Sequence, residues 1–137
     1  MKYLSFLFFL FFANTCFAFE TTAKQAILYD YQTNSVIFEK NSDDLMSPSS
    51  MSKIMTIYYV FKKLNDGELQ LDDKFKVSRK AWKKGGSKMF VDINSSVSIE
   101  DLLRGIIIQS GNDACITIAE GFSESEENFA IELNELA

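Results

Sequence analysis

The sequence predicts a mixed α/β (α+β) fold in which one β-hairpin accompanies a set of packed helices. Two β-prone runs, 26–31 and 36–40, flank a short polar turn, which is typical of an antiparallel hairpin. Four later segments, 50–64, 98–109, 113–121 and 123–136, carry apolar residues at the three- and four-residue steps of an amphipathic helix. Since 47% of the 137 residues are hydrophobic and 24% are charged, the chain can bury one modest core.

The first 18 residues differ in kind from the rest and predict a secretory signal peptide. Lys2 precedes a short apolar run that extends to Ala13, and Cys16-Phe17-Ala18 supplies a small-x-small cleavage site. The run is short for a membrane span, and an uncleaved N-terminal anchor is the alternative. We therefore expect residues 1–18 to direct secretion and residues 19–137 to form the mature part.

Composition excludes several kinds of chemistry. The chain has no histidine, which excludes Ser-His-Asp and Cys-His catalysis and argues against a zinc site; we expect no metal and no cofactor. Removal of residues 1–18 deletes one base, Lys2, and no acid, so 13 basic and 19 acidic residues remain, a net charge of −6. Such a chain does not suggest nucleic acid or anionic lipid as a partner. Cys115 is then the only cysteine, so no internal disulfide is expected and Cys115 is interpreted as a small buried hydrophobe.

The hairpin is followed by a polar connector and then by a helix start. Ser47 is a suitable N-cap and Pro48 suits the first helical position. On that phasing Ser50 and Lys53, three residues apart, lie on one face and can meet. The first amides of a helix have no acceptor within it, so the Ser50 amide is available to an oxyanion. Without histidine, Lys53 is the candidate base; the alternative is a solvated Lys53 and serines that only cap.

The same helix carries an apolar stripe that we expect to be deeply buried, which would hold Ser50 rigidly. The stripe consists of Met51, Ile54, Met55, Tyr58, Phe61 and Leu64. Gly67 is predicted to end the helix at a C′ position. Signals between 69 and 98 are short: a strand at 75–77, a helical turn at 79–84 and a turn at 85–87.

A second polar break, Ser110-Gly111-Asn112, separates two strongly apolar helices. The first opens with a capping box at Ser98, and Gly121 is expected to stop the second. The plain interpretation gives Gly111 the left-handed C-cap and makes Asn112 or Asp113 the next N-cap. The functional interpretation is that a short loop held by two buried helices presents a hydroxyl and an amide to a cleft.

The end of the chain predicts that more sequence belongs to this fold. A capping-box pattern at Ser123 opens a last helix with Phe129, Leu133 and Leu136 on one face, and no C-cap follows before Ala137. The hairpin also lacks the partner strands that a two-stranded ribbon needs for stability. We therefore expect residues 19–137 to be the front part of a longer protein.

Taken in order, these motifs resemble the low-molecular-mass penicillin-binding proteins, the D-alanyl-D-alanine carboxypeptidases of serine peptidase family S11. The matching runs are 27–30, 48–56, 103–106 and 109–115, where 109–115 reads Gln-Ser-Gly-Asn-Asp-Ala-Cys. The resemblance covers essentially the whole mature chain. It implies a β-lactamase/transpeptidase-like fold, here only its N-terminal hairpin and helical subdomain, located in the periplasm or at the outer face of the cytoplasmic membrane.

The resemblance also implies roles for four residues. Ser50 would be the nucleophile that forms an acyl-enzyme with the penultimate D-alanine of a peptidoglycan stem peptide. Lys53 would take the Ser50 proton, Ser110 would relay a proton toward the leaving amine, and Asn112 would bind the substrate backbone or order Lys53. Water would then hydrolyse the ester, whereas β-lactam antibiotics would acylate Ser50 and remain trapped.

One departure bears on activity: the third motif of that family, Lys-Thr-Gly on a sheet strand, does not occur in this sequence. That strand supplies an oxyanion-hole amide and a cation for the substrate carboxylate, and loss of one oxyanion donor costs about 10²–10³ in rate. We expect the 137-residue chain to be inactive and the complete gene product to be the enzyme, with peripheral membrane attachment through a further C-terminal segment. The alternatives are a class A β-lactamase, whose second motif is normally Ser-Asp-Asn, a peptidoglycan endopeptidase, and a non-catalytic secreted binding module.

Overall fold

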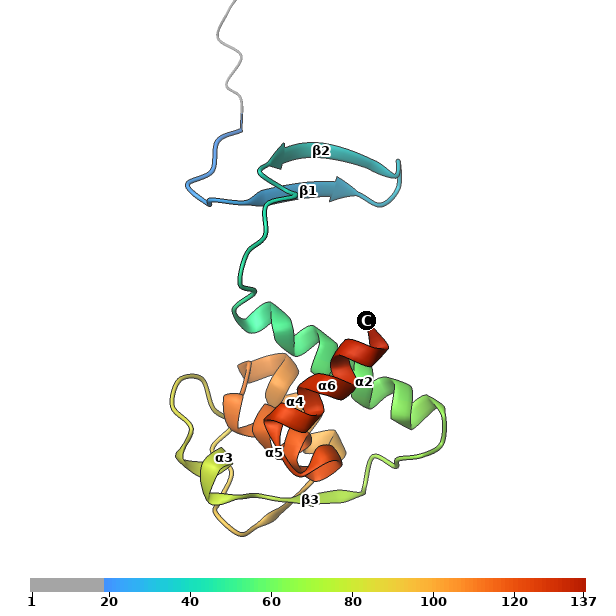
Figure 1. Cartoon of the computed structure of the whole chain (residues 1–137), viewed down its shortest axis with the longest axis vertical. Helices are drawn as coiled ribbons and strands as arrows, with labels where there is room; N and C mark the ends of the chain where they lie inside the picture. Colours follow the sequence, from blue (N-terminus) through green and yellow to red (C-terminus); the bar gives the residue numbers. More distant parts are fainter. Residues whose placement is uncertain (1–18) are drawn as a thin grey trace, which may run out of the picture. The chain divides into compact units, whose positions relative to one another are not determined.

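The computed structural model describes residues 19–137, so the predicted signal peptide lies outside the described residues. The chain divides after Met46 into two units. The first holds a β-hairpin, and the second holds the helices together with a short two-stranded ribbon (Figure 1). The predicted mixture of hairpin and helices is therefore confirmed.

The hairpin consists of β1 (Ala26–Asp30) and β2 (Ser35–Lys40), which pair antiparallel with a bulge between Leu28 and Tyr29. Its turn is closed by the Asp30 side chain, whose carboxylate accepts hydrogen bonds from the Gln32 amide at 2.8 Å and the Thr33 hydroxyl at 2.7 Å. Asn34 completes the turn in the left-handed region, with a φ of 54°. The predicted polar turn is thus stabilised by its own side chains.

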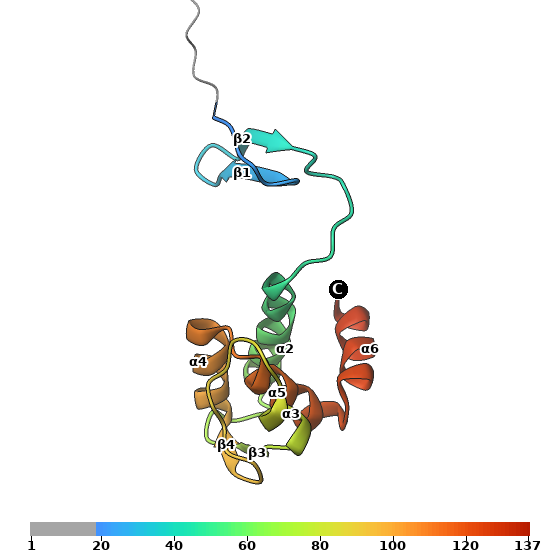
Figure 2. The same ribbon diagram turned by 90° about the vertical axis from the view of Figure 1, so that its left-hand side faces the viewer.

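In the second unit, helix α5 is the central element. The elements run in the order η1 (Ser50–Ser52, a 3₁₀ turn), α2 (Lys53–Asn65), β3 (Lys74–Lys76), α3 (Arg79–Lys83), β4 (Ser96–Ser98), α4 (Ile99–Gln109), α5 (Asn112–Ser123) and α6 (Glu126–Leu136). Helix α5 contacts α2, α3, α4, α6 and β3, and Figure 2 shows α4 and α6 on opposite sides of it. Strands β3 and β4 pair antiparallel, with Phe75 opposite Val97.

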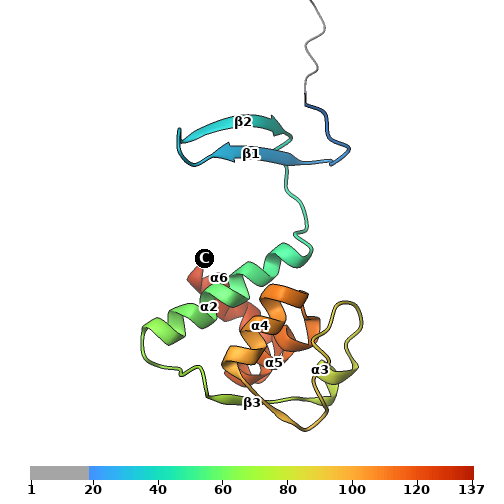
Figure 3. The ribbon, with the colours of Figure 1, turned by 180° about the vertical axis from the view of Figure 1, so that it is seen from behind.

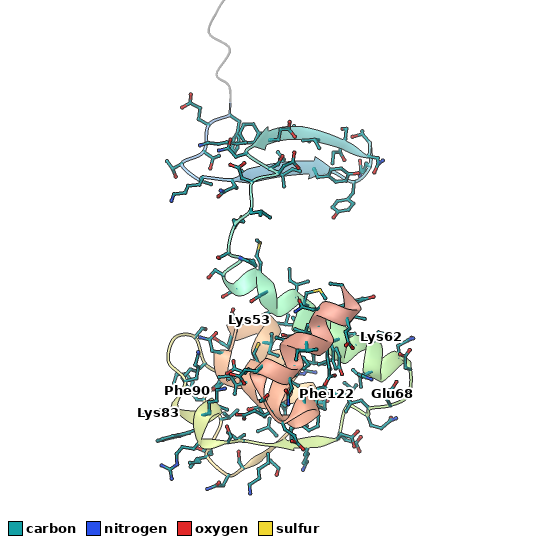
Figure 4. All side chains as sticks on the ribbon, in the orientation of Figure 1. Lys53, Lys62, Glu68, Lys83, Phe90 and Phe122 are labelled. Carbon is teal, nitrogen blue, oxygen red and sulfur yellow. The ribbon has the colours of Figure 1, made fainter. Side chains whose placement is uncertain are left out.

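The core is apolar, with an aromatic cluster where α2, α5, α6 and β3 meet. Tyr59, Phe75, Phe122 and Phe129 contact one another mostly edge to face, with ring centroids 5.0–5.2 Å apart in those pairs; Figure 4 labels Phe122 among the helices. A Cβ on Gly121 would overlap the Phe75 ring. The prediction that Gly121 ends the helix is therefore wrong: α5 continues to Ser123, and the glycine admits the ring.

The buried face of α2 differs from the prediction. Its buried residues are Thr56, Tyr59 and Val60, whereas Ile54 is 65% exposed and most of the predicted stripe is also exposed (Met51, Tyr58 and Phe61). Both faces of this helix carry apolar residues at steps of three and four, so spacing alone could not identify the face that packs on α5 and α6. Figure 3, the view from behind, shows α2 in front of α6.

The helix ends test the capping predictions. Gly67 has a φ of 74°, its amide donates to the Leu64 carbonyl, and the Glu68 amide donates to the Lys63 carbonyl. This Schellman motif confirms Gly67 as the C′ residue. The Ser98 hydroxyl caps α4 as predicted by accepting from the Asp101 amide at 3.1 Å.

Two predicted helix starts are wrong. Ser47 does not cap α2; the helical turn begins at Ser50, because the Ser52 amide and hydroxyl both donate to the Ser49 carbonyl and close a tight 3₁₀ turn. Ser123 is the last residue of α5, and Ser125 instead caps α6 by accepting from the Asn128 amide at 3.0 Å. Among the helices of residues 19–137, none combines the length and the apolar character needed to cross a membrane.

A polar cluster joins α2, α5 and α6 beside the aromatic residues. The Glu132 carboxylate accepts hydrogen bonds from the Ser123 hydroxyl at 2.5 Å and from the Tyr59 hydroxyl. Both bonds lower the pKa of Glu132, and the bond from Ser123 has the larger effect. Burial, followed by the bond to Glu132, raises the pKa of Tyr59. The cluster therefore holds an ionised Glu132 at neutral pH.

Candidate active site

Ser50 and Lys53 lie on one face at the start of α2. Ser50 opens the 3₁₀ turn and Lys53 is the first residue of the α-helix, so the start of the helix brings their side chains together. The Lys53 amine lies 3.4 Å from the Ser50 hydroxyl oxygen, and Ser50 is exposed whereas Lys53 is half-buried. Figure 4 shows Lys53 at the first turn of α2. An accessible hydroxyl thus lies next to a sheltered amine.

The break between α4 and α5 is sharp, and a serine makes it. Ser110 is in the left-handed region, with a φ of 53° and a ψ of 39°, whereas Gly111 has a φ of −61°. The prediction that Gly111 supplies the left-handed residue is therefore wrong. A Cβ on Gly111 would lie 3.0 Å from an Asp113 carboxylate oxygen and 3.2 Å from the Gly105 carbonyl. Glycine is needed there for close approach, and Gly111 itself, not Asn112 or Asp113, is the N-cap of α5.

The Lys53 amine joins the two motifs. It donates to the Ser110 carbonyl at 2.7 Å, to the Asn112 side-chain oxygen at 2.7 Å and to the Ser110 hydroxyl at 3.0 Å. With the Ser50 contact, the other three predicted site residues, Ser50, Ser110 and Asn112, all contact the Lys53 amine. Such an arrangement can pass a proton between two hydroxyl groups through a single nitrogen.

The sequence did not reveal a further part of the site, the segment 85–91. The Gly85 carbonyl accepts from the Asn112 side-chain nitrogen at 2.9 Å, and the Ser87 carbonyl accepts from the Asn112 backbone amide at 2.8 Å. The Gly85 contact fixes the Asn112 side chain with its oxygen toward Lys53. The only sequence signal was the glycine pair, which predicts a turn but not what the turn contacts.

A cavity of about 270 Å³ borders the site between α2, α5 and α6. Lys53, Asn112 and Cys115 contribute to its wall, and Ser50 and Ser110 lie outside it. Cys115 is half-buried, and burial raises the pKa of its thiol to about 11. Cys115 is therefore a protonated thiol at neutral pH and a poor nucleophile. Within residues 19–137 no three acidic or cysteine side chains group together as a metal site.

Comparison with known proteins agrees with this geometry. A sequence model of D-alanyl-D-alanine carboxypeptidases, peptidase S11, matches residues 13–137. The chain is 38% identical over 115 residues to the D-alanyl-D-alanine carboxypeptidase DacF of Bacillus subtilis, covering 84% of this chain and 30% of the relative. It is 40% identical over 131 residues to DacC of Escherichia coli, covering 86% of this chain and 33% of the relative.

The chain is also similar to solved structures of a D-alanyl-D-alanine carboxypeptidase and a penicillin binding protein. The D-alanyl-D-alanine carboxypeptidase DacD from Francisella tularensis matches with a TM-score of 0.79 and 36% identity, over 86% of this chain and 29% of that chain. Penicillin binding protein 5 from Haemophilus influenzae matches with a TM-score of 0.79 and 35% identity, over 87% of this chain and 36% of that chain. The likeness confirms the predicted transpeptidase-like fold. The chain spans about a third of the length of these relatives.

Proposed function

Since the chain belongs to the D-alanyl-D-alanine carboxypeptidase family, peptidase S11, we propose that the complete gene product is a serine-type hydrolase of this specificity. It removes the terminal D-alanine from peptidoglycan stem pentapeptides through an acyl-enzyme on Ser50. The observation that carries the proposal is the Lys53 amine, which contacts Ser50, Ser110 and Asn112 at once.

The contacts of Lys53 suggest how it acts as a base. A neutral amine has two hydrogens and one lone pair, and two partners of Lys53, the Ser110 carbonyl and the Asn112 side-chain oxygen, can only accept. Those contacts, both 2.7 Å long, use the two hydrogens. The lone pair is then left for a hydroxyl proton: the Ser110 hydroxyl lies 3.0 Å from the amine, and the Ser50 hydroxyl lies 3.4 Å from it. Catalytic contacts of this kind are often long without substrate.

The proposed reaction follows from this assignment. The Ser50 oxygen attacks the carbonyl carbon of the penultimate D-alanine while its proton passes to the Lys53 amine. As the peptide bond breaks, the leaving amine receives that proton by way of the Ser110 hydroxyl, and free D-alanine departs. Water then attacks the ester, its proton follows the reverse route, and Ser50 is released. General base catalysis of this kind contributes about 10²–10⁴ in rate.

The oxyanion of each tetrahedral intermediate needs donors. Ser50 opens the helix, so its backbone amide has no acceptor within the helix and is one candidate donor. The Lys-Thr-Gly strand that would supply the second donor does not occur in these 137 residues. The proposal therefore assigns activity to the complete gene product and not to this chain alone.

Location and inhibitors complete the proposal. Residues 1–18, as a signal peptide, would send the protein across the inner membrane to the periplasm, where peptidoglycan lies. The Haemophilus influenzae relative is named for penicillin binding, and by extension β-lactams would acylate Ser50 in this protein. Attachment to the outer face of the cytoplasmic membrane through a further C-terminal segment is part of the same proposal.

Fluorescent-penicillin labelling of the complete gene product tests the proposal. Wild type should form a covalent adduct and Ser50→Ala should form none. Ser49→Ala is the matched control, because Ser49 is the adjacent exposed serine and its side chain makes no capping bond. A wild type without label would favour a non-catalytic binding module. Slow release of the adduct supports a carboxypeptidase, and rapid turnover would indicate a β-lactamase.

A further inference from the structure

Asp113 is a fully buried carboxylate held by backbone amides. Three consecutive amides donate to it: Met89 at 3.0 Å, Phe90 at 2.9 Å and Val91 at 3.3 Å. The Ala114 amide adds a fourth bond at 3.0 Å. None of the ion pairs within residues 19–137 involves Asp113. A buried charge is costly unless its hydrogen bonds are satisfied, so these amides are what make the site tolerable for a carboxylate.

The segment that supplies the amides is held in an unusual conformation. Phe90 has a φ of 63°, which is rare for a bulky side chain, and its side chain is 82% exposed. Figure 4 shows Phe90 on a loop outside the helices. Burial of the ring therefore does not explain the backbone conformation. The positive φ instead turns successive amides toward one point, which is the geometry of an anion-binding nest.

The other end of the same segment holds Asn112. The Gly85 carbonyl accepts a hydrogen bond from the Asn112 side-chain nitrogen at 2.9 Å, and the Ser87 carbonyl accepts one from the Asn112 backbone amide at 2.8 Å. Asn112 in turn accepts from Lys53 at 2.7 Å. A continuous set of contacts therefore runs from the Asp113 carboxylate, through the segment 85–91, to the amine at the centre of the site.

We propose that Asp113 is a positioning residue for acyl transfer, which anchors the segment 85–91 so that this segment orients Asn112 toward Lys53. The inference rests on the proposed function, because it assigns Asp113 a part in that reaction. Asp113 does not touch the reacting atoms. Its effect depends on the single conformation that the segment adopts when three of its amides share one carboxylate.

The test measures the rate of acylation by fluorescent penicillin in the complete gene product. Asp113→Asn replaces one acceptor oxygen with a donor that faces other donors, so the nest opens. Acylation should slow by about 10- to 100-fold, the range expected when a site residue is displaced by the order of 1 Å. Asp92→Asn is the matched control, because Asp92 is exposed and loses the same charge close to the same segment. It should acylate at the wild-type rate.

A double-mutant cycle separates positioning from general loss of stability. If Asp113 acts through Asn112, Asp113→Asn should slow acylation much less in an Asn112→Ala background than in wild type. A purely structural role would instead give the same factor in both backgrounds, and that result overturns the inference. So does a wild-type rate for Asp113→Asn. A wild type that never labels would remove the proposed function, and the inference with it.

A second pair of variants leaves Asp113 unchanged. This pair tests whether the segment 85–91 must be anchored even if Asp113→Asn does not fold. Phe90→Pro removes one donor and forbids a positive φ, whereas Phe90→Gly keeps the amide and tolerates that φ. Phe90→Pro should slow acylation by about 10- to 100-fold, and Phe90→Gly should acylate markedly faster than Phe90→Pro. Equal rates for the two variants would overturn the inference.

Discussion

One methyl group at Gly86 would test the active-site geometry directly. Gly86 has a φ of 81°, and a Cβ at this position would lie 2.7 Å from the side-chain nitrogen of Asn112. At its neighbour Gly85, a Cβ would meet no atom within 4 Å, and the φ of Gly85 is not in the left-handed region. Gly85→Ala is therefore a matched control for Gly86→Ala.

Two costs follow for Gly86→Ala. An L-residue in the left-handed region costs about 1–2 kcal/mol, which lowers the melting temperature of a unit of this size by roughly 4–16 °C. The second cost falls on the site. Ordinary contact begins at 3.4 Å, so the Asn112 nitrogen must retreat by about 0.7 Å from its 2.7 Å distance. Since Gly85 and Lys53 both bind that side chain, the shift weakens at least one contact. Displacement of this order slows a reaction by up to about 100-fold.

The assay combines the acylation rate of the complete gene product, followed with fluorescent penicillin, with thermal unfolding of the same variants. Gly86→Ala should acylate about 10- to 100-fold more slowly than wild type, while Gly85→Ala should acylate at close to the wild-type rate. If Gly86→Ala acylates as fast as Gly85→Ala, the orientation of Asn112 does not control Lys53 and the reasoning is refuted.

Three further predictions concern stability and are measured on the 137-residue chain. Gly121→Ala should reduce the free energy of unfolding by about 1–3 kcal/mol, because the new methyl overlaps the Phe75 ring; unchanged denaturant unfolding would contradict this packing. Val60→Ala should cost about 2 kcal/mol because Val60 is fully buried, whereas Ile54→Ala on the exposed face should cost almost nothing, and the reverse order would show that the faces of α2 are misassigned. The pKa of Glu132 is lowered from 4.5 by the hydroxyl groups that donate to it, so its stabilising contribution is present above that value and is lost as the pH falls through the lowered pKa. Glu132→Gln should therefore flatten the loss of stability below about pH 4.5 in acid titrations, and an unaltered pH dependence would count against the cluster.

The contact between Ser50 and Lys53 was predictable because the start of a helix fixes which side chains three residues apart can meet. Gly67 was predictable for a similar reason, since a left-handed C′ residue within a short polar stretch leaves a local signal. The buried face of α2 was not predictable, because that helix is apolar on two faces and the spacing of its residues favours neither. Gly121 was misinterpreted as a helix end, because the sequence could not indicate that an aromatic ring from β3 lies against it.

In the site, too, some features left a local signal in the sequence and others depend on the packing of distant segments. A polar break at Ser110 and Asn112 was visible in the sequence, and their roles were inferred only from the resemblance to a family. That these residues reach Lys53, 57 and 59 positions earlier, depends on how α4 and α5 pack against α2. The support that segment 85–91 gives to Asn112 left no periodic signal at all.

By itself the sequence determined the hairpin, the existence of the longer helices, the lack of histidine in these 137 residues and the local pair of Ser50 and Lys53, because each depends on composition or on neighbours within a few residues. Only the tertiary structure decided which helix faces are buried, which residue turns the corner before α5, and that the segment 85–91 contacts both Asp113 and Asn112. Those features depend on contacts between segments distant in the chain, whose geometry is set by the packing of the whole unit.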